Sequence, residues 1–187
     1  MLSGRRLDLL DPSPLDVEIE DIAHGLARVA RWNGQTHGAH IYSVAQHCLL
    51  VERIGVALDA SIGRGERLFL LLHDAPEYVI GDMISPFKAV IGDAYKSVEN
   101  RILAAILLRF SLPAEPAPGL LRLCKKADRA AAFFEAVHLA GFTRAEAERI
   151  FPRPAISPQS FLDDLTPLPV DAAQARFLER FRTVEEM

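Results

Sequence analysis

Residues 68–74 read Leu-Phe-Leu-Leu-Leu-His-Asp. The apolar run Leu68–Leu72 would be hydrophobic on every side of a helix, so this helix belongs at the centre of the protein. Two polar residues, His73 and Asp74, follow the run directly. Because an aspartate is rarely buried unless it is paired or binds a metal, the stretch predicts a central helix and a site beside it.

Apolar residues recur at spacings of three and four along most of the chain, which is typical of helices that bury one face. Pro76 lies inside the central helix and predicts a kink there, because proline removes one backbone donor. No strand pattern or internal repeat is present, so we expect an all-α, single-domain helical bundle over residues 1–187. We expect its helices in the segment from Pro12 to about Arg31, over about Ile41 to Leu58, from the end of a Gly63-Arg64-Gly65 break to near Gly81, over about Asp93 to Phe110, about Gly119 to Leu139, Arg144 to Ile150, and about Asp171 to Arg182.

The composition excludes several classes of protein. A hydrophobic fraction of 50% and a charged fraction of 25% are those of an ordinary globular protein rather than a disordered one. The formal net charge of -4 argues against a broad nucleic-acid surface. No apolar run is long enough for a bilayer and no signal peptide is evident, so we expect a cytoplasmic protein. The two cysteines, Cys48 and Cys124, are expected to be reduced thiols packed among apolar residues.

Four polar residues on apolar helical segments indicate a metal site: His47, His73, Asp74 and Asp128. A histidine on an apolar face is by itself more often a hydrogen-bonded core residue. Two imidazoles and two carboxylates from three helices, however, can converge on one divalent ion. This mixed donor set suits manganese, cobalt, zinc, nickel or magnesium and leaves coordination positions open. Glu77, four residues after His73, would share its helical face.

The order and surroundings of these residues resemble the H…HD…D signature of the HD-domain phosphohydrolase superfamily. The resemblance covers about residues 18–140 and leaves a helical extension, about residues 141–187, without a counterpart. Within the superfamily, the chain is similar to the 5'-deoxynucleotidases and related deoxynucleotide phosphohydrolases. The strings that carry the resemblance are Tyr42-Ser43-Val44-Ala45-Gln46-His47, Leu72-His73-Asp74-Ala75-Pro76-Glu77, Gly81-Asp82 and Lys126-Ala127-Asp128-Arg129, with Arg31-Trp32 upstream.

This resemblance implies a role for each matching residue. The metal ligands would be His47, His73, Asp74 and Asp128, with Asp74 and Glu77 as the catalytic carboxylates. Glu77 would position or activate the attacking water. The substrate would be bound by Arg31 as a phosphate clamp, Trp32 against the sugar or base, Asp82 on the 3'-hydroxyl and Lys88 as a second phosphate contact.

Each role has a plainer alternative. Glu77 could be a solvated residue or an ion-pair partner, and Asp82 could be a turn residue at a helix end. Arg31 and Lys88 could be surface charges, and Trp32 could anchor the core.

Three departures from the family limit the transfer. The loop between Trp32 and His47 is longer than in the nucleotidases and contains His37 and His40, which either bind substrate or are exposed. Gln46 stands where an acidic residue often precedes the first histidine, so the groups around the metal ligands differ. The extension would cover the site, form an oligomer contact or complete the core.

We therefore expect a metal-dependent phosphohydrolase that cleaves a phosphate ester of a nucleotide, and the choice between a monophosphate and a triphosphate stays open. The expected partner is a small nucleotide or another phosphoester, with no extended nucleic acid and no membrane, while a homodimer stays open. Three alternatives remain: an HD hydrolase of another phosphoester such as guanosine tetraphosphate, a non-catalytic metal-dependent nucleotide sensor, and a purely structural bundle without metal.

Overall fold

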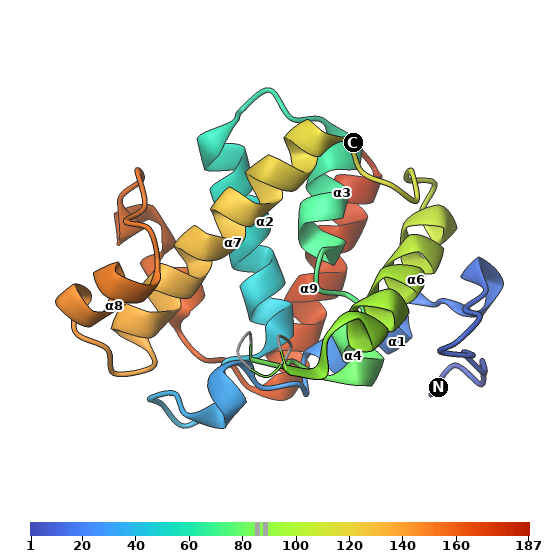
Figure 1. Ribbon diagram of the computed structural model, residues 1–187, viewed down its shortest axis with the longest axis horizontal. Helices are drawn as coiled ribbons and strands as arrows, with labels where there is room; N and C mark the ends of the chain where they lie inside the picture. The colour runs from blue at the N-terminus through green and yellow to red at the C-terminus, as the bar shows by residue number, and fades with distance from the viewer. Residues whose placement is uncertain (85–86, 88–89) are drawn as a thin grey trace.

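The computed structural model of the protein describes residues 1–84, 87 and 90–187 (Figure 1). These residues form no strand, and their isolated β-bridge pairs Ala30 with Ser43, so the prediction of an all-α fold is confirmed. None of the helices described is both long and apolar enough to cross a bilayer. The helices are α1 (Ile19–Leu26), α2 (Val44–Leu58), α3 (Arg64–Leu72), α4 (Glu77–Ile80), α6 (Asp93–Arg109), α7 (Pro118–His138), α8 (Arg144–Ile150) and α9 (Val170–Glu185), with 3-10 turns η1 (Pro14–Asp16), η2 (Arg31–Gly34) and η3 (Pro158–Leu165).

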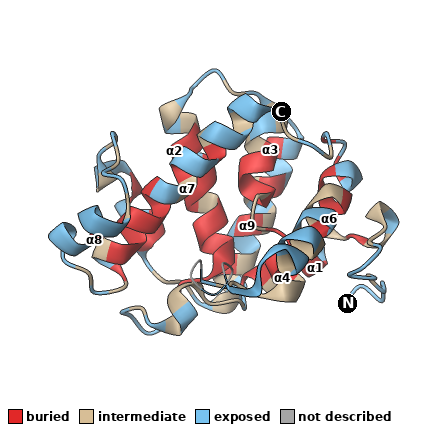
Figure 2. Cartoon of the chain, in the orientation of Figure 1, coloured by how far each residue is buried: buried red, intermediate tan, exposed pale blue. Residues whose placement is uncertain are grey.

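The core is built around α2, which packs against α3, α7 and α9. All five residues of Leu68–Leu72 in α3 are buried, as the sequence predicts for a central helix (Figure 2). Gly55 of α2 faces Leu70 of α3 so closely that a Cβ atom at position 55 would overlap the leucine side chain. This close approach brings the helix that carries His47 next to the helix that leads into His73.

Local signals explain where the helices begin. The helix predicted from Ile41 begins at Val44, because Ser43 is extended and its side chain accepts a hydrogen bond from Gln46 N. In the first segment only Ile19–Leu26 is α-helical, so Arg31 lies in η2 rather than in a helix. The later helices α6, α7, α8 and α9 occupy the ranges predicted for them to within three residues.

The central helix is broken rather than kinked, which corrects the prediction of one helix reaching Gly81. α3 ends at Leu72, and a turn precedes α4. Pro76 cannot donate to the carbonyl of Leu72, and Ala75 N donates to that oxygen instead, at 2.9 Å. His73 and Glu77 therefore do not share the face of one continuous helix.

The C-terminal extension completes the core. α9 packs against α1, α2 and α3 and buries Ala173, Phe177, Phe181 and Val184. The rings of Phe110 and Phe181 lie edge to face, with their centroids 4.8 Å apart. Of the three roles expected for this extension, the structure therefore shows the completion of the core.

A buried ion-pair cluster also ties the extension to the central helices. Glu52 of α2 is fully buried and accepts hydrogen bonds from Arg67 of α3 at 2.7 Å and from Arg180 of α9 at 2.9 to 3.0 Å. Two guanidinium groups therefore satisfy the one buried carboxylate.

Candidate metal centre

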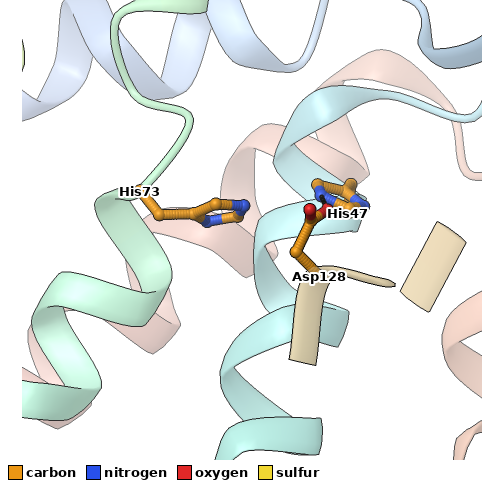
Figure 3. Close-up of side chains that lie close together, drawn as sticks. All are labelled: His47, His73 and Asp128. Atoms are coloured by element: carbon orange, nitrogen blue, oxygen red, sulfur yellow. Dashed lines mark ion pairs between the residues drawn. The ribbon is translucent and has the colours of Figure 1, made fainter. Parts of the chain in front are cut away.

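Three helices converge on one group of potential metal ligands (Figure 3). His47 comes from α2, His73 caps the C-terminal end of α3, and Asp128 comes from α7. One ligand atom from each side chain lies within 4.8 Å of the other two. Nitrogen and carboxylate ligands bind divalent ions at about 2.0–2.2 Å, so three atoms this close together could hold one ion.

Both histidines direct their Nε2 atoms toward the place where the three side chains meet. The Nδ1 atom of His47 lies 2.5 Å from Glu135 Oε1, and that of His73 lies 2.9 Å from the carbonyl oxygen of Leu70. These acceptors favour the tautomer with the proton on Nδ1, which leaves the Nε2 lone pair available. Both Nε2 atoms are buried and make no hydrogen bond within the part of the chain that the structure describes. The donor set therefore fits a divalent cation.

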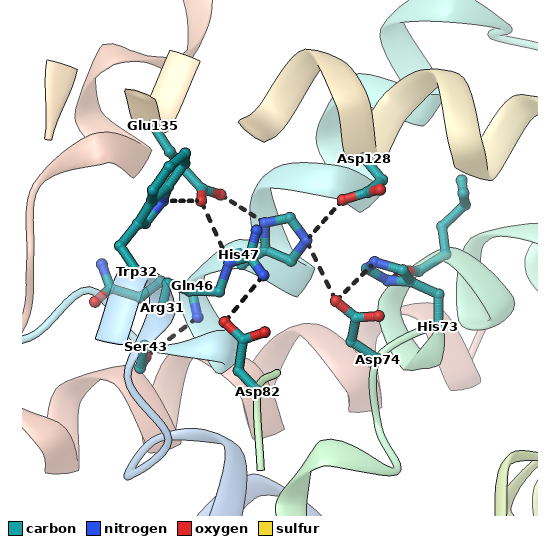
Figure 4. A network of polar contacts seen from close by, with 11 residues as sticks. Arg31, Trp32, Ser43, Gln46, His47, His73, Asp74, Asp82, Asp128 and Glu135 are labelled. Atoms are coloured by element: carbon teal, nitrogen blue, oxygen red, sulfur yellow. Dashed lines mark hydrogen bonds and ion pairs between the residues drawn. The ribbon is translucent and has the colours of Figure 1, made fainter. Parts of the chain in front are cut away.

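Asp74 faces both imidazoles from the turn between α3 and α4. Its Oδ2 atom lies 3.5 Å from His47 Nε2 and 3.3 Å from His73 Nε2. Asp128 Oδ1 approaches His47 Nε2 from the other side at 3.3 Å. The four residues predicted as ligands are thus brought together, with two carboxylates around two imidazoles (Figure 4).

The carboxylates set the electrostatics of the centre. Burial and the Arg31 guanidinium lower the pKa of His47, but Glu135 and Asp128 outweigh them and raise it to about 9. Burial raises the pKa of Asp74, but the two imidazoles, His73 above all, bring it well below its usual range. The carboxylates therefore create a negative potential at the two imidazoles, and a bound divalent cation would replace the extra proton that this potential favours on His47.

Glu135 is a central residue of the site that the sequence reading missed. It is fully buried on α7 and accepts from Trp32 Nε1 at 2.8 Å and from Arg31 Nε at 3.3 Å, besides its contact with His47. Burial raises the pKa of this carboxyl, but Arg31 and His47 lower it to about 2. A signal was present: Glu135 is the acidic residue in the apolar run from Ala130 to Ala136, two helical turns after Asp128.

Arg31 and Asp82, both predicted to bind substrate, contact each other. Arg31 Nη1 donates to Asp82 Oδ2 at 3.1 Å, and only 14% of the arginine side chain is exposed. The backbone N–H of Arg31 donates to Tyr42 O at 2.8 Å, so the loop with Arg31 is fixed to the start of α2. The guanidinium is thereby held at the edge of the metal centre (Figure 4).

Trp32 packs against two aromatic rings, as a residue that anchors the core would. Its ring centroid lies 5.8 Å from that of Phe142 and 6.2 Å from that of Phe151, and its Nε1 donates to Glu135. Its φ of 56° is in the left-handed region, which a bulky residue adopts only where contacts hold it.

The remaining predicted residues lie as follows. Glu77 is buried at the start of α4, and its charge adds to burial in raising the pKa of the Cys48 thiol. Lys88 lies outside the described residues. His37 and His40 are both exposed, which is the second of the two alternatives given for them.

Gln46 does not face the metal centre. Its side chain donates to Thr166 O at 2.8 Å and accepts from Leu168 N at 3.1 Å, which attaches the C-terminal segment to α2. The acidic partner of the first histidine is instead Glu135, from a different helix.

Comparison with known proteins identifies relatives of the chain but assigns none of them an activity. No family model matches. An uncharacterized protein of Rhodobacter capsulatus is 61% identical over 155 residues, which are 82% of this chain and 79% of that protein. The uncharacterized protein YfdR of Escherichia coli is 35% identical over 98 residues, 52% of this chain and 49% of that protein. Given this identity and coverage, the chain belongs to the same family as the Rhodobacter capsulatus protein.

Proposed function

We propose that this protein is a metal-dependent phosphohydrolase of the HD-domain type that cleaves a phosphate ester of a nucleotide, as a 5'-deoxynucleotidase does. The observation that carries the proposal is the pair of buried Nε2 atoms of His47 and His73. Neither makes a hydrogen bond with the described residues, and both face the carboxylate of Asp74. Leaving two such atoms without a partner is costly unless a cation binds them.

The ligands of the proposed ion are His47, His73, Asp74 and Asp128. These ligands offer two imidazole nitrogen atoms and carboxylate oxygen atoms. Such a set suits manganese, cobalt, zinc, nickel or magnesium. When bound, the ion supplies a Lewis acid that offsets the charge of the phosphoryl group.

Arg31 is the proposed phosphate clamp. Its Nη1 and Nε atoms are held by Asp82 and Glu135, whereas its Nη2 atom makes no hydrogen bond with the described residues. A guanidinium held in this way needs little ordering before it donates to a phosphate oxygen.

Glu77 is the proposed proton carrier, because a buried carboxylate next to the turn with Asp74 can accept a proton from water or donate one to the leaving group. Asp82 would bind the sugar hydroxyl, and Trp32 would contact the sugar or base. Lys88 would be the second phosphate contact. The presence of Glu77 favours an enzyme over a non-catalytic sensor.

The test is phosphate release from a panel of ribo- and deoxynucleoside mono- and triphosphates. Chelated protein is re-supplied with manganese, cobalt, zinc, nickel or magnesium, and a parallel set contains a pyrophosphatase so that cleavage to pyrophosphate is detected. Asp74→Ala removes the proposed ligand. Asp171→Ala is the matched control, because the side chain of Asp171 is 97% exposed and far along the chain on α9.

Metal-dependent release that is lost in Asp74→Ala and retained in Asp171→Ala is the expected result. Guanosine tetraphosphate is added to the panel, and its hydrolysis would identify the alternative HD hydrolase that acts on this substrate. If the metal binds stoichiometrically and no substrate turns over, the hydrolase proposal fails and a nucleotide sensor replaces it.

A further inference from the structure

A concave site is lined by residues of α7, by Leu58 at the end of α2 and by residues 152–156, which follow α8; Figure 1 shows where these elements lie. Its volume is about 280 Å³. None of the described residues that line it is acidic, although the chain as a whole has a net charge of -4. We call this site the basic pocket, because five of its lining residues are cationic: Arg122, Lys125, Lys126, Arg129 and Arg153.

The positive charges of the basic pocket are not neutralised within the part of the chain that the structure describes. The four cations on α7 form no ion pair with a described carboxylate, and Arg153 reaches only Glu148, at 4.0 Å. The pocket between α2 and α9 is different, because the acidic residues Asp164 and Glu179 line it beside its three arginines, and two of these, Arg53 and Arg180, are paired with Asp164 and Glu52.

The cations on α7 are spaced so that neighbouring side chains repel one another. Arg122 and Lys126 are four residues apart, as are Lys125 and Arg129, so like charges are neighbours on one face of the helix. Such pairs destabilise a helix, and an anion with several charges would relieve them.

The other walls of the basic pocket are apolar. They are formed by Leu58, Ala130, Pro152, Pro154, Ala155 and Ile156. Low-polarity walls strengthen the field of the surrounding cations on a bound anion.

The basic pocket adjoins the metal centre along α7, because Lys125 precedes Asp128 by three residues and lies about 60° from it around the helix, but the pocket extends to the other flank. Lys126 precedes Asp128 by two residues, so their side chains point about 200° apart around α7. Asp128 faces His47, and Lys126 therefore points to the opposite flank of the helix.

We propose that the basic pocket binds a ligand with two or more linked phosphate groups. Free inorganic polyphosphate and the phosphate chain of a nucleotide share this chemistry. The pocket is independent of the proposed hydrolase activity, because none of its lining residues is a proposed ligand or substrate contact.

The test is isothermal titration of chelated, full-length protein with orthophosphate, pyrophosphate, tripolyphosphate and ADP at physiological ionic strength. The variant Arg122→Gln with Lys126→Gln removes two pocket charges. The matched control, Arg6→Gln with Lys96→Gln, removes two exposed charges elsewhere and gives the same net charge. We expect tripolyphosphate to bind the parent and the control, and the pocket variant to bind it roughly 10- to 100-fold more weakly.

Two further measurements make the result decisive. Circular dichroism during heating shows whether the pocket variant is folded, and Lys126→Arg should retain binding because it keeps the charge. Tighter binding of ADP than of pyrophosphate supports a nucleotide ligand, and equal binding supports recognition of the phosphates alone. The proposal is overturned if no polyphosphate binds, or if the control variant weakens binding as much as the pocket variant does.

Discussion

The Nδ1 atom of His47 lies 2.5 Å from the Oε1 atom of Glu135, and neither side chain is exposed to solvent. The carboxylate also accepts hydrogen bonds from Arg31 and Trp32, so one buried group connects the candidate metal centre with both residues of the proposed substrate loop. An acceptor in this position holds the imidazole with Nε2 directed at the other ligands and makes it more basic.

Glu135→Gln is therefore expected to weaken metal binding about 10- to 100-fold, the range for residues that orient a metal ligand. The amide keeps the size of the side chain but removes its charge. Competition with a chelating indicator dye measures the affinity, and Glu186→Gln, at an exposed position, is the control. Unchanged affinity in Glu135→Gln would show that the contact with His47 is structural only.

Arg31→Lys is expected to lower kcat/KM at least roughly tenfold while leaving the fold intact. Lysine keeps the charge, but it cannot contact Asp82 and Glu135 and still present a planar pair of donors to phosphate. Steady-state kinetics on the best substrate of the panel measure the effect. Arg28→Lys, on an exposed arginine that contacts Gln174, should be close to the parent, and an equal loss in both variants would argue against a clamp at Arg31.

Gly25→Ala is expected to destabilise the protein by roughly 1–3 kcal/mol, because the added methyl group overpacks a backbone contact. A Cβ at position 25 would lie 2.7 Å from both the Cβ and the carbonyl oxygen of Tyr78. In Gly65→Ala the nearest atom is Leu112 Cδ2 at 3.7 Å, so that variant should be neutral or up to about 1 kcal/mol more stable. Urea denaturation measures both, and similar values for the two would contradict this account of the α1–α4 contact.

Tyr78 is expected to make the protein less stable in strong alkali. Burial and then Asp21 raise the pKa of its phenol to about 12 from an ordinary value of 10.0. Because the folded-state pKa is the higher one, the stabilisation is complete below pH 10 and is lost as the pH rises through 12. Between pH 9 and 11.5 the parent should lose about 1–2 kcal/mol more than Tyr78→Phe, a shift discounted for partial exposure. Parallel losses in the two proteins, measured by urea denaturation, would exclude Tyr78 as the cause.

Much of the fold could be predicted from local patterns. The apolar run Leu68–Leu72 predicts a buried central helix because a helix without a polar side has to be enclosed, and this is confirmed. The extents of α6, α7 and α8 follow from prolines, caps and periodicity, which act within a few residues. His47, His73 and Asp74 could be singled out for the same reason, because each follows or interrupts an apolar stretch, whereas Asp128, between Lys126 and Arg129, was indicated by its match to the HD signature.

The tertiary structure alone decided which groups meet. Pro76 predicts a disturbance of the helix, but that α4 packs against α1 is visible only in the folded chain, and Glu135 becomes a partner of His47 only when α7 lies against α2. The basic pocket likewise needs α7 and residues 152–156 side by side. The sequence by itself determined the helices and the candidate ligands, because propensity and periodicity are local. The tertiary structure decided that Glu135 contacts His47 and that the basic pocket forms, because these contacts join residues far apart in the chain.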